Sequence, residues 1–191
     1  MKNAKKILAL LLCAVLLVGA SIAGTVAYLT SKDEVTNTFT VGKVQITLDE
    51  TDVDVNGVKD GETRVKENTY KLIPGHTYVK DPVVHVDAES ENCFPYIKVE
   101  NQIAGIEAVT TIADRLAANG WSLVTDETNV YTYKEVCGVG YNIPTFTQFK
   151  VKEDVQDLSA YNCLSVKVTA YAVQHDGFAS ADAAWEATFG A

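Results

Sequence analysis

Three histidines, His76, His85 and His175, are the side chains of this chain best suited to holding a catalytic metal ion. None lies in the His-Glu-x-x-His motif, whose spacing puts both imidazoles of a zinc peptidase on one helix face. Each lies instead in a turn-like or strand-like context, where a histidine needs no ligand. The sequence therefore predicts no metal site and no cofactor.

The sequence supports nucleophilic catalysis no better than it supports a metal site. The Gly-x-Ser-x-Gly motif of many serine hydrolases is absent from the sequence. Cys93, Cys137 and Cys163 have no obvious neighbour that would lower a thiol pKa. In an exported protein two of the three could form a disulfide, or all three could be buried thiols, and the sequence does not select a pair. We therefore expect no catalytic residue.

Residues 52–57 look like the opening of a calcium-binding loop, with oxygen ligands at alternate positions. The match fails at the twelfth position, where Thr63 stands in place of the required glutamate. Asn56–Gly57 is also the dipeptide that favours a type I′ turn. Residues 53–58 are therefore predicted to form a β-hairpin.

The elements that position these residues are mostly short strands. The clearest alternation of apolar and polar residues is at Leu164–Gln174. Other strands are expected at residues 70–73, 77–87, 94–100, 122–124, 130–136 and 146–151. This succession predicts an all-β fold, a jelly-roll-like antiparallel β-sandwich.

Two short peripheral helices complete the predicted fold. The first is expected at Ala108–Asn119, with one apolar face made by Val109, Ile112, Ala113 and Leu116. The second is expected at Ala181–Phe189, because Ser180 is a good N-cap.

The first 29 residues have the pattern of an export signal. A cluster of lysines is followed by the apolar run Ile7–Val18 and then by small residues. Thr25 and Ala27 suit the narrow pockets of a signal peptidase, which would cut before Tyr28. The alternative is an uncleaved membrane anchor, because residues 7–29 are long enough to cross a hydrocarbon core.

Cleavage at this point would give a signal peptide at residues 1–27 and one β-sandwich domain at residues 28–191. Residues 1–27 contain three of the 16 basic residues and no acidic residue, so residues 28–191 carry 13 basic against 25 acidic side chains, a net charge of −12. Such a chain is a poor ligand for nucleic acid. Contact with the membrane is expected only through the signal segment before cleavage.

Several blocks of sequence resemble one family. They are Gly-Thr-Val-Ala-Tyr-Leu-Thr at 24–30, Asn-Thr-Phe-Thr-Val-Gly at 37–42, Ile-Thr-Leu at 46–48, Leu-Ile-Pro-Gly at 72–75, Lys-Asp-Pro at 80–82, Tyr-Ala-Val-Gln at 171–174 and Asp-Gly-Phe at 176–178. They are similar to the TasA/camelysin family of secreted bacterial proteins, which are cut by the SipW-type signal peptidase.

This resemblance implies a secreted or cell-surface subunit of biofilm-matrix fibres, with the SipW-type peptidase and other copies of the chain as its partners. The family's fibres assemble partly by passing an N-terminal strand to a neighbouring subunit. Its metallopeptidase label is the least favoured implication, because no catalytic motif accompanies it.

An exchangeable strand is expected within residues 28–48, which form a leader and the first strand. Its apolar set is Phe39, Val41, Val44, Ile46 and Leu48. A strand beside a freed terminus is easily exchanged, because only its leader must move. The alternative is that the strand folds into its own sheet in a monomeric secreted or cell-wall-associated binding module.

The expected cleavage before Tyr28 can be tested directly. Mass spectrometry of the secreted protein should give a chain that begins at Tyr28, because Thr25 and Ala27 provide small residues at both specificity positions. Recovery of the full-length chain in the membrane fraction would contradict cleavage and favour the anchor.

Overall fold

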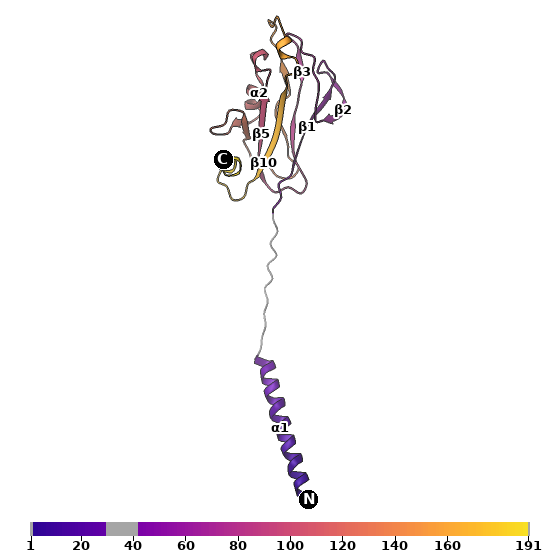
Figure 1. Cartoon of the computed structure of the whole chain (residues 1–191), viewed down its shortest axis with the longest axis vertical. Helices are drawn as coiled ribbons and strands as arrows, with labels where there is room; N and C mark the ends of the chain where they lie inside the picture. The colour runs from indigo at the N-terminus through magenta and orange to yellow at the C-terminus, as the bar shows by residue number, and fades with distance from the viewer. Residues whose placement is uncertain (1, 30–41, 191) are drawn as a thin grey trace. The chain divides into compact units, whose positions relative to one another are not determined.

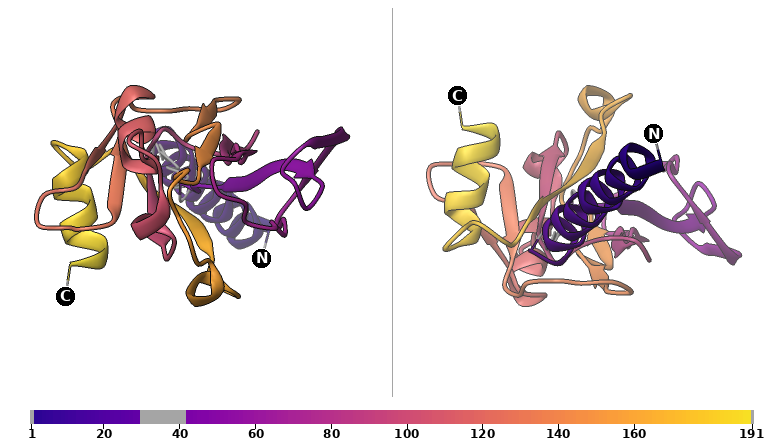
Figure 2. Two further views of the ribbon diagram at one scale, coloured as in Figure 1. Left: turned by 90° about the horizontal axis from the view of Figure 1, so that it is seen from above. Right: turned by 90° about the horizontal axis from the view of Figure 1, so that it is seen from below.

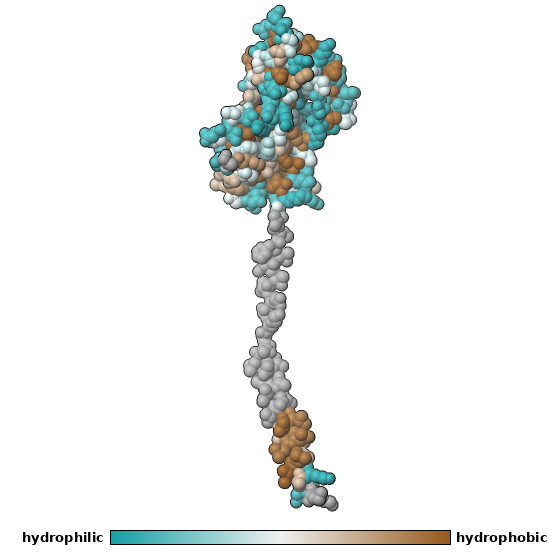
Figure 3. All heavy atoms as spheres, viewed as in Figure 1, coloured by the Kyte–Doolittle hydropathy of each residue, from teal (hydrophilic) through white to brown (hydrophobic). Residues whose placement is uncertain are grey.

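A computed structural model describes residues 2–29 and 42–190, and the chain divides into two compact units, Met1–Thr40 and Val41–Ala191. The first unit contains one helix, α1 (Lys2–Leu29). Apolar side chains in its first half, from Ile7 to Leu17, are exposed and form a hydrophobic surface (Figure 3). Among the helices of the described residues, none combines the length and the hydropathy that crossing a membrane requires.

The second unit is built from three antiparallel sheets. One has the order β2-β1-β4-β8, with the bounds Lys59–Val65, Ile46–Val53, Val83–Val86 and Asn142–Pro144. The next has the order β10-β5-β7-β6, with the bounds Val166–Gln174, Cys93–Asn101, Val130–Tyr133 and Trp121–Leu123. The third pairs β3 (Thr77–Val79) with β9 (Gln148–Lys150).

The two larger sheets enclose the main core. Val84 of β4, Ile97 of β5 and Ile143 of β8 are each at most 1% exposed and belong to one apolar cluster. Inward side chains of β1 and β10 pack against the same cluster, and these two strands run alongside one another (Figure 1). The predicted all-β antiparallel sandwich is confirmed.

The helices of this unit are peripheral. Helix α3 (Ala181–Phe189) begins after Ser180, whose hydroxyl accepts a hydrogen bond from the amide of Ala183, as the sequence predicts. Ala184 and Trp185 bury its inner face in a second apolar cluster on the outer side of β5 and β10. Figure 2 shows α3 and the β1–β2 hairpin at opposite sides of this unit. Two 3₁₀ turns, η1 (Ala104–Ile106) and η2 (Ser159–Tyr161), lie in connections.

Helix α2 (Ile112–Ala118) is shorter than predicted. Thr111 and Asp114 form a reciprocal capping box, which starts the helix at Ile112. Ile112 and Leu116 are buried, but Ala113 is exposed and Val109, which precedes the helix, is 98% exposed. The predicted apolar face is therefore wrong at Val109 and Ala113.

Several strand predictions need correction. Residues 70–73 are not a strand, and the single strand expected at 77–87 is divided into β3 and β4. Pro82, which has no N–H to give to a sheet, lies in the break. Strands β2 and β8 are absent from the sequence prediction because β2 is polar and largely exposed, and β8 has three residues.

The β1–β2 connection is a hairpin, as predicted, but its turn is not type I′. Only Gly57 has a positive φ, at 72°, whereas type I′ needs two such residues. The amide of Gly57 donates to the Asp54 carbonyl, and the Asp54 carboxylate accepts from the amides of Val58 and Asn56. These hydrogen bonds lower the pKa of Asp54. Residues 54–57 therefore form a tight turn, and Gly57 at its end has a left-handed backbone conformation.

The close approach of Gly57 to Tyr78 can be tested by substitution. A Cβ at this position would lie 2.8 Å from Cδ1 and 2.9 Å from Cα of Tyr78, so Gly57→Ala adds a backbone clash to the strain of positive φ. We expect a loss of about 3 kcal/mol in unfolding free energy, measured by urea denaturation.

Gly61→Ala is the matched control, because Gly61 has a φ of 79° and nothing within 4 Å of the added Cβ. It should cost about 1 kcal/mol, from backbone strain alone. Equal losses in the two variants would show that the contact with Tyr78 carries no penalty.

Candidate functional site

An opening in the second unit lies between β1 and β10. Among the strands of residues 42–190, β10 pairs with β5 alone, so its other edge has no neighbouring strand. The first half of β1, Ile46–Asp49, pairs with β4, whereas β2 begins to pair only at Glu50. Two incomplete strand edges therefore face the same side of the sandwich.

A groove of about 1200 Å³ occupies this opening. Most of its lining comes from residues 46–50 of β1, residues 65–72 from the end of β2 onward, residues 161–165 before β10, and residues 166–170 of β10. Small-molecule pockets usually have volumes of roughly 300–1,000 Å³. The groove is thus larger than such pockets, and its long sides are strand edges.

The floor of the groove is apolar. Ile46 and Leu48 of β1 face Val166, Val168 and Ala170 of β10, and all five side chains are half-buried against the main core. Their alternation along each strand puts them on the inner face. The floor therefore offers alternating apolar positions of the kind that an extended peptide with alternating apolar residues can fill.

A buried ion pair closes the groove at the Glu50 end. The Lys80 Nζ lies 2.7 Å from a Glu50 oxygen, and these side chains are 10% and 7% exposed. Asn68 donates a hydrogen bond to the other Glu50 oxygen, and Lys80 also lies 5.9 Å from the centre of the Tyr70 ring. Burial, together with the nearby charges of Glu50 and Asp81, raises the pKa of Tyr70. This end of the groove is polar but fully paired.

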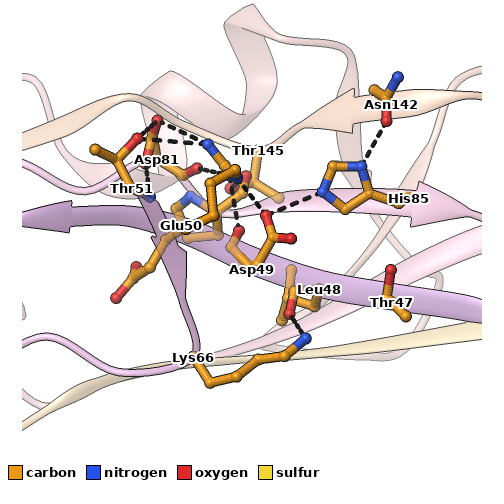
Figure 4. Close-up of polar contacts among 12 residues, drawn as sticks. Thr47, Leu48, Asp49, Glu50, Thr51, Lys66, Asp81, His85, Asn142 and Thr145 are labelled. Carbon is orange, nitrogen blue, oxygen red and sulfur yellow. Dashed lines mark hydrogen bonds and ion pairs between the residues drawn. The ribbon is translucent and has the colours of Figure 1, made fainter. Parts of the chain in front are cut away.

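A second polar cluster holds β1 from its outer face (Figure 4). Asp49 accepts hydrogen bonds from Arg64 and His85, and Asp81 accepts two bonds of 2.7 Å from the amide and hydroxyl of Thr51. Partial burial opposes ionisation of Asp49, but the bonds from Arg64 and His85 outweigh it and lower the pKa of Asp49. This cluster ties β1 to β2 and β4, and Lys66 donates a hydrogen bond to the Leu48 carbonyl beside the groove.

The residues predicted to form the exchangeable strand are divided by the structure. Ile46 and Leu48 belong to β1 of the chain's own sheet, and Val44 packs against the same core before β1 begins. Phe39 and Val41 lie outside the described residues. In this single chain Val44, Ile46 and Leu48 thus lie in the chain's own domain, and exchange of the strand stays a prediction. Thr25, Ala27 and Tyr28 lie in the last part of α1, and their cleavage stays a prediction.

The three histidines do not come together. A ring nitrogen of His76 lies 2.8 Å from the Asn56 carbonyl oxygen, and His85 lies between Asp49 and Asn142. His175 contacts its neighbour Asp176 at 3.0 Å. In the part of the chain that the structure describes, no group of three or more His, Cys, Asp or Glu side chains could hold a metal ion. The donor set there does not fit a catalytic zinc site.

The comparisons with known proteins give one match. The family model described as Camelysin metallo-endopeptidase matches residues 2–77, a range that includes α1, β1 and β2. Over these residues the chain is similar to camelysin, in line with the resemblance to the TasA/camelysin family. Neither the curated proteins nor the solved structures contain a significant match. Members of the TasA/camelysin family are extracellular or associated with the cell surface, as the resemblance implies.

The ion pair between Glu50 and Lys80 can be tested by removing one or both charges. Lys80→Met leaves the Glu50 carboxylate buried without its counter-charge, so the unfolding free energy should fall by about 3 kcal/mol in guanidinium denaturation. The double variant Glu50→Leu/Lys80→Met removes both charges and should recover most of that loss. A single variant as stable as the unmodified chain would contradict the importance of this pair.

Proposed function

We propose that this protein is a secreted subunit of extracellular biofilm-matrix or cell-surface fibres, and that its leader fills the groove of a neighbouring copy. The observation that carries the proposal is the groove itself, an apolar floor between two incomplete strand edges. An added strand would pair with the free backbone groups of β10 and cover the half-buried floor.

The leader of the chain has a suitable length. Residues 30–41, which precede the described part of this unit, would span ~40 Å if extended. The nine residues of β10 span ~30 Å as a strand. The leader also contains Phe39 and Val41 in alternation, which suits a floor of alternating apolar positions. One copy could therefore cover the whole edge of another.

Signal cleavage would control this assembly. While α1 remains attached, the leader joins the domain to a helix with an exposed apolar surface. After a cut before Tyr28, the leader has a free end and can enter a groove. SipW-type peptidase would then be the partner that permits polymerisation.

The alternative is a monomeric secreted or cell-wall-associated binding module, in which the leader fills the groove of its own chain. Peptidase activity is the least favoured candidate, because the described residues hold no fitting donor set. A triple variant of His76, His85 and His175 to glutamine tests it, since proteolysis lost in that variant would support a metallopeptidase.

The apolar floor of the groove can be tested by placing a charge on it. Val168→Glu puts a charge on the apolar floor, so the processed protein should no longer form fibres in electron microscopy. Because Val168 is half-exposed to the open groove, the subunit itself should lose only about 1 kcal/mol of stability and keep its circular dichroism spectrum.

Leu123→Glu is the matched control, because it puts the same charge at an exposed apolar position of β6, outside the groove. It should form fibres normally. A synthetic peptide of residues 28–43 should bind a domain that begins at Val44 and should not bind its Val168→Glu form. Equal fibre formation by both variants, or no fibres from the unmodified protein, would favour the monomeric module.

A further inference from the structure

Cys93, at the start of β5, and Cys137 lie directly opposite one another. They form an isolated antiparallel bridge, in which the Cys93 amide donates to the Cys137 carbonyl at 2.8 Å and the Cys137 amide donates to the Cys93 carbonyl at 2.9 Å. Residues paired in this way have Cα atoms about 5.5 Å apart and side chains on the same face. Disulfides join residues whose Cα atoms are about 4.4–6.8 Å apart, so the backbone geometry suits a cross-link.

The two thiols are also enclosed together. Both residues are 0% exposed and belong to the main core, whereas Cys163 is exposed in the loop beside the groove. In the form described here the cysteines are thiols, and the Cys137 Sγ lies 3.5 Å from the Glu135 carbonyl oxygen. Cys163 has no comparable partner among the described cysteines.

We propose that Cys93 and Cys137 form a disulfide in the exported protein, and that Cys163 remains a thiol. Each thiol loses one proton and one electron as the Sγ–Sγ bond forms. The two electrons and two protons reduce the disulfide of an exported thiol–disulfide oxidoreductase to its dithiol. The bond ties the segment after β7, which crosses to β8 of the other sheet, to the start of β5.

The order of events follows from burial. Burial raises the pKa of Cys93 to about 11, and burial with the neighbouring Cys93 and Glu135 raises the pKa of Cys137 to about 12. The thiolate is the form that attacks a disulfide, so the folded dithiol reacts slowly near neutral pH. The bond therefore forms before folding encloses the pair.

Peptide mapping tests the proposed disulfide between Cys93 and Cys137. The full chain is reduced, unfolded, refolded in a glutathione redox mixture, alkylated in denaturant and digested. Mass spectrometry should find the peptides of Cys93 and Cys137 linked, with Cys163 alkylated. The folded, reduced chain placed in the same mixture should form the link at least tenfold more slowly. Alkylation of both Cys93 and Cys137 after refolding, or a link from either to Cys163, would overturn the proposal.

Thermal denaturation gives a second readout. Dithiothreitol should lower the melting temperature of the oxidised chain by about 10 °C, because reduction frees the loop between the two cysteines in the unfolded state. It should have the same effect on Cys163→Ser and no effect on Cys93→Ala/Cys137→Ala. If the double variant does not fold, the unmodified chain and Cys163→Ser still decide: no shift in either would contradict the disulfide.

Discussion

Backbone hydrogen bonding along one side of the sandwich is the constraint on which the rest of this structure depends. A strand without a neighbour exposes a row of N–H and C=O groups that readily pair with another chain. Among the described strands, β10 pairs only with β5, and the first half of β1 pairs only with β4. The half-buried apolar floor between them is the consequence, because no strand of residues 42–190 covers it.

Two polar clusters tie β1 to the segments around it. Glu50 and Lys80 place a paired charge where β2 takes over the pairing, and Asp49 with Arg64 and His85 holds the outer face. A buried charge pair adds little net stability but penalises arrangements that separate its members. In the single chain these contacts hold β1 in its own sheet.

Sequence reasoning succeeded where the local signal was strong. The alternation in β10 and the Ser180 cap of α3 were sufficient for both elements, and the TasA/camelysin resemblance is confirmed over residues 2–77. It failed where a strand forms because of the strand beside it and not because of its own residue pattern. Strand β2 is polar and forms because the hairpin aligns it with β1, and the predicted strand at residues 77–87 divides at Pro82 between two sheets. The groove and the opposed Cys93 and Cys137 depend on which strands pair, so neither could be read from the sequence.

Amide hydrogen exchange along β10 tests the central claim most directly. In an antiparallel strand, alternate amides point toward each neighbour, so half of the β10 amides point away from β5. In a domain that begins at Val44 these outward amides should exchange quickly, while those bonded to β5 are protected. In assembled fibres the outward amides should become protected as well. Rapid exchange of the outward amides in both samples would show that no strand occupies the groove.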